Sequence, residues 1–310
     1  MKILIIGLGS IAKKHIAAIR SIDSNASIYA LRSQHNAQAY DEITNLYSFG
    51  EASNIGFDFA IISNPTSEHK HTIQKLLEFR IPLFIEKPVS SSPIDDLINS
   101  IKASKILSYV ACNLRFLEVI EFLKERIESG DTPGRINEVN VYCGSYLPEW
   151  HPGTDFRESY SARPEMGGGV HLDLIHELDY ICWIFGMPDS YKAFCRNKSS
   201  LNIDAIDYAK YLLFYKDFAC DLTLNYFRRD YKREIEILFD SVTWKVDLPK
   251  NTIVDSNGVI IFESEQSGID TYTDQMQYFI NLVSNNEKDS FNDIIFANEI
   301  LKLCLNYERP

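Results

Sequence analysis

The fold is decided near the start of the chain, where residues 3–12 read ILIIGLGSIA. The four apolar residues that open this stretch predict a short strand covered on both faces. Gly7 and Gly9 permit a tight turn, and the amphipathic stretch Ile11–Ile22 predicts a helix. Ala12 is small enough for that helix to pack closely on the strand. Strand, glycine turn and helix in this order indicate the first unit of a parallel α/β sheet.

The same alternation continues to about residue 115. Short apolar runs predict further strands at Ser27–Leu31, Phe57–Ile62, Leu83–Ile85 and Ser108–Ala111. Amphipathic stretches between them predict helices at Glu68–Phe79 and Ile94–Ser104. Thr66 or Ser67 can cap the first of these helices, and Ser92 followed by Pro93 can open the second. Repeated βα units predict a doubly wound parallel sheet with right-handed crossovers, the Rossmann arrangement.

Beyond residue 115 the pattern changes to alternating strands with few helices. We expect helices at Phe116–Glu128, Val170–Phe185, Tyr272–Ser284 and Phe291–Asn306, and a strand at Ile136–Tyr146. Further strands are expected at Tyr191–Arg196, Ala205–Tyr215, Phe218–Phe227, Tyr231–Phe239, Val242–Val246 and Val259–Glu263. The sequence therefore predicts a nucleotide-binding domain at 1–115. It predicts an α+β substrate-binding and oligomerisation domain at 116–310, with an open, mostly antiparallel sheet.

Length and composition agree with two folded domains. The chain has 310 residues, 45% of them hydrophobic and 24% charged, which excludes a disordered chain, a collagen and a short disulfide scaffold. The formal net charge of −12 argues against binding to nucleic acid or anionic membranes, because like charges repel. No Lys/Arg cluster suggests a local exception.

Cysteine usage and hydropathy point to a cytoplasmic protein. The six widely spaced cysteines, without a CxxC pair, are typical of free buried thiols in a reducing compartment. They are Cys112, Cys143, Cys182, Cys195, Cys220 and Cys304. The apolar run at the N-terminus is too short for a signal peptide, and no run of about 18 uncharged apolar residues predicts a membrane span.

The glycine turn has the GxGxxA pattern that binds a dinucleotide when it follows a strand and opens a helix. Gly7 allows the turn, Gly9 lets the backbone approach a pyrophosphate, and the free N–H groups around Ser10 and Ile11 face its charge. A single such motif is weak, and a simple glycine turn is the alternative. Its position in a βα chain favours nucleotide binding.

The end of the second strand bears on the choice between NAD and NADP. An Asp or Glu there accepts from the ribose 2′-hydroxyl, but this sequence has Arg32 and Ser33. Both can bind a 2′-phosphate, which favours NADP. The alternatives are that Arg32 is a solvated charge, or that it stacks on adenine while NAD binds.

Four further segments, in order, resemble the glucose–fructose oxidoreductase / inositol dehydrogenase / MocA (Gfo/Idh/MocA) family. The segments are Asn64-Pro65-Thr66-Ser67-Glu68-His69, Glu86-Lys87-Pro88, Asn113-Leu114-Arg115-Phe116 and the GGGVHLDLIHELD run at 167–179. Each alone is modest, but the ordered set spans nearly the whole chain. The resemblance implies a Rossmann domain followed by a domain with an open antiparallel sheet, and an NAD(P)-dependent oxidoreductase.

The resemblance also implies roles for individual residues. Lys87 would lie beside the nicotinamide and act in acid–base chemistry, completed by Asp173 and His176. The cofactor would be bound by Gly7, Gly9, Ser10, Ile11, Arg32, Ser33, Asn64, Pro65, His69, Glu86, Lys87 and Asn113. Arg115, Asp173 and His176 would contact the substrate.

Elementary chemistry agrees with these roles. Removing a hydride from a carbinol carbon requires a group that takes the hydroxyl proton, and histidine or a perturbed lysine titrates in the useful range. Asp173 and His176 are three residues apart, so on one helix they would share a face and the carboxylate would orient the ring. Many family members have an interval of four, which leaves Asp173 open as a surface charge. Lys87 can instead contact only the cofactor, and Asp179 can be structural.

A metal site is the alternative for the cluster of His, Asp and Glu between 171 and 179. At about 100° per residue, His171 points away from Asp173 and His176, so one helix cannot direct all three at one ion. There is no HExxH pattern. We therefore predict no metal and expect His171 to be packed or to lie at the domain junction.

The loop between residues 147 and 169 is rich in aromatic and charged residues. Trp150, Arg157 and Tyr160 suit a polyhydroxylated ligand, because rings stack on sugar faces and guanidinium groups bind hydroxyls or anions. A structural loop or an oligomer contact is the alternative. Gly167–Gly169 would give the backbone room to approach the nicotinamide or a strand.

Together these features predict hydride transfer between a nicotinamide and a sugar, sugar derivative or nucleotide-linked sugar, by a homodimer or homotetramer. A non-catalytic dinucleotide-binding sensor on the same scaffold is the alternative from another class. Reduction of an imine or biliverdin-type substrate and oxidation of a trans-dihydrodiol are alternatives among enzymes.

Overall fold

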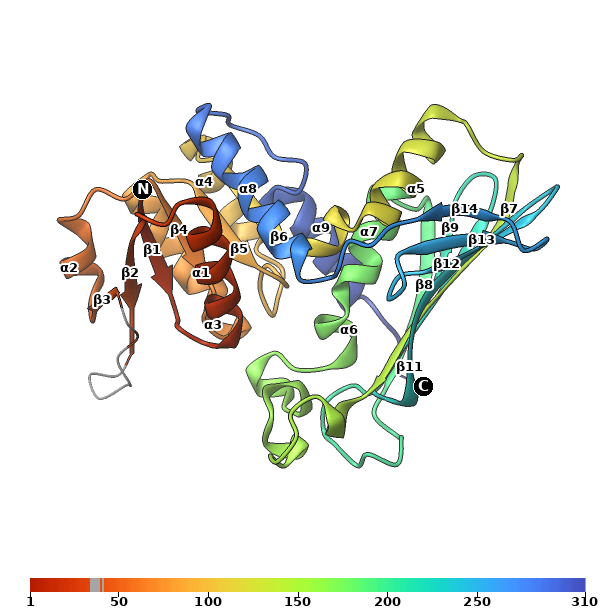
Figure 1. The fold of residues 1–310 in the computed structure, drawn as a ribbon. Coiled ribbons are helices and arrows are strands. Elements are labelled where there is room, and N and C mark those ends of the chain that lie inside the picture. The colour runs from red at the N-terminus through yellow and green to blue at the C-terminus, as the bar shows by residue number, and fades with distance from the viewer. Residues whose placement is uncertain (34–39, 41, 310) are drawn as a thin grey trace. The chain divides into compact units, whose positions relative to one another are not determined.

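Two sheets of different character organise the chain, shown in Figure 1. A computed structural model describes residues 1–33, 40 and 42–309. The described chain divides into two units, one formed by Met1–Asn113 with Ile269–Leu301 and the other by Leu114–Gly268 with Lys302–Pro310.

The sheet of the first unit has six parallel strands in the order β3-β2-β1-β4-β5-β6. Their bounds are β1 (Lys2–Ile6), β2 (Ser27–Leu31), β3 (Ile43–Leu46), β4 (Phe59–Ile62), β5 (Leu83–Glu86) and β6 (Ser108–Ala111). All residues of β4, β5 and β6 are buried, which explains why these strands read as continuous apolar runs. The order places the topological switch point between β1 and β4, and dinucleotides bind at such a point, at the carboxyl ends of the strands.

Helices connect the strands of this sheet. They are α1 (Ser10–Ile22), α2 (Phe49–Ser53), α3 (Thr66–Leu76) and α4 (Asp95–Ser104). From the far end of the sequence, α8 (Asp270–Ser284) lies beside α1 in Figure 1 and buries Phe279 against Phe59 and Phe84, with ring centroids 5.2 and 5.4 Å away. This aromatic packing explains why 269–301 belongs to the first unit, whereas the sequence analysis grouped it with the second domain.

The sheet of the second unit has eight strands in the order β14-β13-β12-β11-β7-β10-β9-β8. All neighbours are antiparallel except β7 and β10. The strands are β7 (Ile136–Tyr146), β8 (Ser190–Arg196), β9 (Tyr208–Phe214), β10 (Ala219–Asn225), β11 (Phe227–Phe239), β12 (Thr243–Asp247), β13 (Thr252–Asp255) and β14 (Ile260–Glu263). The expected fold class, a Rossmann sheet followed by an α+β unit with a mostly antiparallel sheet, is confirmed.

Apolar side chains alternate along the strands of the second sheet and form its core. Val139, Val141, Ile235 and Ile237 are at most 2% exposed. The helices of this unit are α5 (Glu118–Ser129), α6 (Val170–Asp173) and α7 (Ile175–Phe185), and α9 (Ile294–Leu305) ends in it. Gly130 ends α5 in the left-handed conformation, with φ 71°, as expected for a helix C-terminus.

Several local expectations differ from the structure. Strands β3 and β13 and the short helix α2 have no counterpart in the sequence analysis, because four- and five-residue segments carry little periodicity. Helix α4 begins at Asp95 after Ile94, so Pro93 is not its first residue. The expected single helix Val170–Phe185 is divided at Leu174, which has φ −102° and ψ 29°.

All six cysteines are free and buried, as expected. In the part of the chain that the structure describes, no helix has the length and hydropathy needed to cross a membrane. Over the same residues, no three His, Cys, Asp or Glu side chains gather as a metal site would require.

Candidate functional site

The turn after β1 is shaped by its contact with the segment after β4. Gly7 has φ +86°, and a Cβ there would lie 2.7 Å from the Cα of Asn64, so only glycine fits. The Gly7 amide donates to the carbonyl of Leu31 at 3.2 Å. From β4, the Ser63 hydroxyl donates to the carbonyls of Ile6 and Gly7 at 3.2 and 3.0 Å. These bonds hold the glycine turn at the switch point of the sheet.

Gly9 borders open space on the side where a side chain would project. It precedes α1, and a Cβ there would meet no described atom within 4 Å. No side chain caps the amides at the start of α1 among the described residues, and Ser10 and Ile11 are exposed and half-buried. An uncapped helix N-terminus beside open space suits the pyrophosphate of a dinucleotide, so these residues fit such a group.

The end of β2 carries Arg32 and Ser33. The Arg32 amide donates to the carbonyl of Leu46 at 2.9 Å, and its guanidinium lies 3.5 Å from the Oδ1 of Asn45. Arg32 is half-buried and Ser33 is exposed. Strand β3, which the sequence analysis did not foresee, therefore positions the backbone and side chain of Arg32.

Asn64, Pro65 and His69 form the turn and first helical residues after β4. The Asn64 Nδ2 donates to Thr72 at 2.9 Å, while its Oδ1 is buried and has no hydrogen-bond partner among the described residues. Pro65 precedes α3. The His69 ring lies between the carbonyls of Asn64 and Pro88, at 2.9 and 3.0 Å. Burial lowers the pKa of His69, and the two carbonyls oppose that shift.

Glu86 and Lys87 are held from the opposite side by a second buried histidine. The Nε2 of His15, on α1, lies 2.5 Å from the Oε1 of Glu86, and His15 is fully buried. The other carboxylate oxygen accepts from the Lys87 amide at 3.3 Å. The His15 and His69 rings therefore fix the backbone on both sides of Lys87, whose side chain is half-buried.

Asn113 lies at the carboxyl end of β6, in a short 3-10 helix. Its Nδ2 donates to the hydroxyl of Thr271 at 2.8 Å, and Thr271 is fully buried at the start of α8. The structure thus places the predicted cofactor residues of the first unit at the carboxyl ends of β1, β2, β4, β5 and β6.

In the second unit, Asp173 and His176 lie on either side of a helix break. Asp173 ends α6 and His176 is the second residue of α7, so the expectation that they share one face of one helix is wrong. The break at Leu174 is consistent with an interval that is one residue shorter than in many family members. Asp173 is 5% exposed and His176 is half-buried.

Asp173 has a partner that the sequence analysis missed. The hydroxyl of Tyr226, between β10 and β11, makes a short hydrogen bond to the Asp173 carboxylate. Burial, with the nearby Asp173 carboxylate, raises the pKa of Tyr226, so this phenol stays a donor. Trp150 packs edge-on against Tyr226, with ring centroids 5.3 Å apart, and its Nε1 donates to Ser145 at 3.0 Å. Asp173, Tyr226 and Trp150 therefore form one connected group.

Arg115 and Asp179 form a buried bidentate ion pair. The Arg115 Nε and one terminal nitrogen donate to the two Asp179 oxygens at 2.7 and 2.8 Å, and Arg115 is 1% exposed. Asp179 thus has the structural role that the sequence analysis left open, with a side-chain partner. Because Arg115 is enclosed, we leave it out of the substrate-binding set proposed below.

The loop after β7 presents Arg157 and Tyr160 at the surface. Arg157 lies over the Phe156 ring and 3.4 Å from Asp155, and Tyr160 is 43% exposed. A Cβ on Gly168 would lie 2.0 Å from the carbonyl oxygen of Tyr160, so this glycine allows the loop to fold back on itself. The expected close approach therefore involves the loop and not a strand.

A cavity of about 390 Å³ lies within the second unit, beside this connected group. It is lined by Cys143, Ser145, Tyr146, Glu149, Trp150, Leu174, Arg229, Tyr231 and Arg233. Among these residues, the sequence analysis proposed only Trp150 as a substrate contact. Alternation along the strand places residues 229, 231 and 233 on one face, but a register irregularity hid that face from sequence reasoning.

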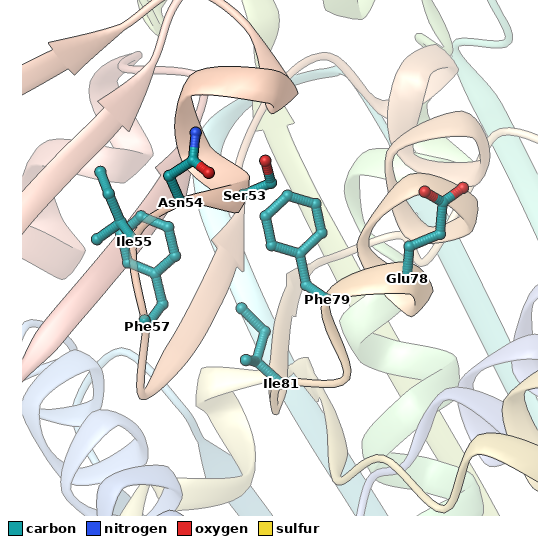
Figure 2. Close-up of a pocket in the computed structure, with 8 residues that line it drawn as sticks. Ser53, Asn54, Ile55, Phe57, Glu78, Phe79 and Ile81 are labelled. Carbon is teal, nitrogen blue, oxygen red and sulfur yellow. The ribbon is translucent and has the colours of Figure 1, made fainter.

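A second cavity, shown in Figure 2, lies in the first unit at the opposite edge of the sheet. It has a volume of about 470 Å³, and its walls come from segments that precede β4 and β5, including Phe57, Phe79 and Ile81. Ligands of doubly wound sheets bind at the carboxyl ends of the strands. This cavity is therefore at the wrong edge for a dinucleotide.

Comparisons with known proteins agree with this geometry. Residues 1–110 match the oxidoreductase family with an NAD-binding Rossmann fold, and residues 120–244 match the GFO/IDH/MocA C-terminal domain. The resemblance found in the sequence is thereby confirmed. A comparison with curated proteins found no match.

Solved structures share the fold over nearly the whole chain. A UDP-N-acetylglucosamine 3-dehydrogenase from Acidithiobacillus ferrooxidans is 17% identical, with 99% of this chain and 96% of that chain covered and a TM-score of 0.78. A myo-inositol 2-dehydrogenase from Lactobacillus plantarum is 19% identical, with 98% of this chain and 95% of that chain covered and a TM-score of 0.75. A levoglucosan dehydrogenase in complex with NADH and levoglucosan is 13% identical, with 98% of this chain and 95% of that chain covered and a TM-score of 0.82.

Proposed function

Because this chain belongs to the GFO/IDH/MocA oxidoreductase family, we propose that it transfers a hydride between a nicotinamide cofactor and a carbinol or carbonyl carbon of a sugar, a sugar derivative or a nucleotide-linked sugar. Structural neighbours that act on a nucleotide sugar, an inositol and levoglucosan support this substrate class. The observation that carries the proposal is the family match over both units, together with the doubly braced segment that holds Lys87.

In this proposal the first unit binds the cofactor and the second binds the substrate. The amides at Gly9, Ser10 and Ile11 hold the pyrophosphate, because they begin a helix whose dipole favours negative charge. The buried Oδ1 of Asn64 is an acceptor that still needs a donor, which suits a hydroxyl or amide of the dinucleotide. The remaining contacts come from Pro65, His69, Glu86, Lys87 and Asn113, the last four largely through a fixed backbone.

The protein's contribution to the chemistry is acid–base. A bound nicotinamide supplies or accepts the hydride. Lys87 and His176 are the two candidates for the group that takes the proton from the substrate hydroxyl during oxidation and returns it during reduction. Asp173, whose carboxylate accepts a hydrogen bond from Tyr226, supports His176 as the acid–base group of the second unit. Trp150, Arg157 and Tyr160 contact the substrate.

Replacement of Lys87 tests this proposal. Lys87→Ala should lower kcat by about 10²- to 10⁴-fold, the usual contribution of a general acid or base. The dissociation constant of NADH, measured by fluorescence titration, should change little. Lys75→Ala, on the exposed face of α3, is the matched control and should leave both values unchanged. Turnover near normal in Lys87→Ala would remove the assigned role.

Complete absence of turnover in the unmodified protein is a separate outcome. If a broad panel of sugars gives no hydride transfer while NADH or NADPH binds tightly, the protein is a dinucleotide-binding sensor on this scaffold. Turnover with imines or dihydrodiols, but not with sugars, would assign it to a different class of reductase.

We further propose that NADP is preferred over NAD. Arg32 and Ser33 stand where an acidic residue would accept from the ribose 2′-hydroxyl, and a guanidinium binds a phosphate through charge-assisted hydrogen bonds. Arg32→Ala should therefore weaken NADPH binding by about 10- to 100-fold and leave NADH binding nearly unchanged. Titration of both cofactors checks this, and an equal loss for both contradicts it.

Self-association is the remaining part of the proposal. Phe194 on β8 and Phe214 on β9 are 38% and 36% exposed on neighbouring strands of the second sheet. Such a face favours a homodimer or homotetramer. Light scattering coupled to size-exclusion chromatography measures the assembly. A monomer at all concentrations would contradict this part.

A further inference from the structure

The cavity of the second unit contains more positively charged side chains than recognition of a neutral sugar needs. Resting on the function proposed above, we propose that this cavity binds an anionic group, a carboxylate or a phosphoryl, on the non-reacting part of the substrate. The roles proposed above concern the cofactor, the reacting carbon and contacts to the sugar, and none of them assigns an anion-binding group. This cavity would decide which sugars are accepted.

An irregularity in β11 builds the cavity. Phe227 faces Tyr146 and Lys232 faces Gly144, so residues 228–231 lie opposite the single residue Ser145. Extra residues of this kind bend a strand and redirect its side chains, and they are common beside active sites. Here Arg229, Tyr231 and Arg233 all line the cavity, as expected for residues two apart on a strand.

Arg233 is a preorganised donor. Its Nε donates to the Oε1 of Glu177 at 2.5 Å, and Glu177, on α7, is fully buried. This bond to a buried carboxylate holds the guanidinium in one orientation. Tyr231 and Cys143 also interact with this guanidinium, so the flat group with its five N–H donors is held in a fixed position at the cavity wall.

Arg229 supplies a second positive charge to the cavity. It is exposed, its guanidinium lies 3.9 Å from the centre of the Tyr146 ring, and it makes no ion pair with any residue the structure describes. Ring stacking restrains the group without using its donors. Glu149 also lines the cavity, but it is exposed, so solvent screens its charge. Two guanidinium groups converging on one cavity suit a carboxylate or phosphoryl oxygen pair.

The rest of the wall fits a sugar and connects it to the proposed acid–base residues. Tyr146, Trp150 and Tyr231 supply ring faces, and a volume of about 390 Å³ lies within the range of small-molecule sites. Trp150 contacts Tyr226, which in turn binds Asp173, and Leu174 follows Asp173 in the chain. A substrate whose anionic group lies at Arg229 therefore has its ring next to the group that includes Asp173.

Two variants and one neighbouring control isolate the charge. Arg229→Gln removes the unpaired guanidinium but keeps a polar side chain, and Arg229→Lys keeps the charge. Arg228→Gln is the matched control, because Arg228 precedes Arg229, pairs with Asp230 and lies over the Tyr142 ring instead. Arg229 is exposed and Arg228 is half-buried, so all three variants should fold, and their melting temperatures check this.

The first measurement follows turnover with sets of sugars that differ only in charge. Each set contains a neutral aldose, its uronate and its 1-phosphate, in the gluco, galacto and manno series. We expect kcat/KM at least 10-fold higher for an anionic member than for its neutral partner. Arg229→Gln should raise KM for that member by about 10- to 100-fold with little change in kcat, while Arg228→Gln does not. The uronate and phosphate arms identify which anion is used.

The second measurement needs no turnover. Titration with inorganic phosphate, followed by the fluorescence of Trp150 with Trp150→Phe as reference, should show saturable binding that Arg229→Gln abolishes and Arg228→Gln retains. Neutral sugars used as well as the acids, or phosphate binding unchanged in Arg229→Gln, would overturn the inference. Phosphate binding that depends on Arg229 in a protein that turns over no sugar would instead overturn the proposed function and leave the anion site standing.

Discussion

The carboxyl edge of the first sheet and the cavity of the second unit use polar side chains in opposite ways. At the first, Ser63 and His69 direct their polar atoms at the protein's own backbone, and Glu86 binds the His15 ring and the Lys87 amide. What they leave for a ligand is uncapped backbone at α1 and open space above Gly9. In the second unit, side chains such as Arg229 line the cavity themselves.

The first region suits the pyrophosphate that all dinucleotide cofactors share, and the second suits one particular substrate. A backbone surface binds the same pyrophosphate whatever side chains surround it, so its requirements reduce to glycines and a helix start. A cavity lined by side chains distinguishes substrates by their charge and shape, so each wall residue matters. Two comparisons between the units and one within the first unit test this division, beginning with the largest expected effect.

The first comparison concerns buried carboxylates. Asp179→Asn in the second unit leaves the guanidinium of Arg115 buried without its counter-charge, which should cost about 3–5 kcal/mol of unfolding free energy. Glu86→Gln in the first unit keeps a hydrogen-bonding partner for His15 and for the Lys87 amide, so it should cost about 1–2 kcal/mol. Urea denaturation measures both. Equal losses would contradict the view that the charge of Asp179 contributes more to stability than that of Glu86.

The second comparison concerns buried histidines and pH. Burial, aided by repulsion from Arg309, lowers the pKa of His171 to about 4. Since this lies below the unfolded value of about 6.5, the neutral ring contributes stability above pH 6.5, and that stability is lost as the pH falls through 4. The loss amounts to about 3 kcal/mol.

His171→Phe keeps the edge-on contact with Tyr307 and removes the titrating group, so stability should fall less steeply between pH 6.5 and 4. His69 in the first unit faces two carbonyls that favour its charged form, so His69→Phe should flatten the profile less. Denaturation curves at several pH values decide between the two. Identical profiles for His171→Phe and the unmodified protein would show that its burial does not govern acid unfolding.

The third comparison is between the two glycines of the turn. Gly7→Ala places a Cβ 2.7 Å from the Cα of Asn64, at a residue with a left-handed backbone conformation. This change should lower the free energy of unfolding by more than about 1 kcal/mol and weaken the binding of the cofactor. Gly9→Ala meets open space at φ −88°, so the fold should keep its melting temperature while NADH binding weakens. Unchanged NADH binding in Gly9→Ala would show that the open space above Gly9 does not hold the pyrophosphate.

The first unit was largely predictable because its strands are buried on both faces. Runs such as Leu83–Ile85 are apolar throughout and appear in the structure at nearly the expected positions. Strand β3 escaped prediction because its four residues, Ile43–Leu46, are mostly half-buried and show no clear period. The last helices were recognised, but the packing of Phe279 that assigns α8 to the first unit involves residues about 200 positions apart in the chain.

The candidate site was predictable only where a local motif marks it. The ordered segments around Gly7, Asn64, Lys87 and Asn113 are contiguous in sequence, so each could be named. Tyr226 and Arg229 belong to no such motif, since their importance comes from the strands that surround them. The helix break at Leu174 also escaped, because a gap of three residues is compatible with an unbroken helix.

The sequence by itself determined the βα order, the glycine turn and the family, because these depend on hydrophobic periodicity and on residues adjacent in the chain. Three facts needed the tertiary structure: Arg115 is enclosed by Asp179, Asp173 binds Tyr226, and Arg229 lies over the Tyr146 ring at a cavity wall. Partners distant in sequence leave no periodic signal, since pairing across a sheet or a helix face depends on register and burial, which arise only when the chain packs.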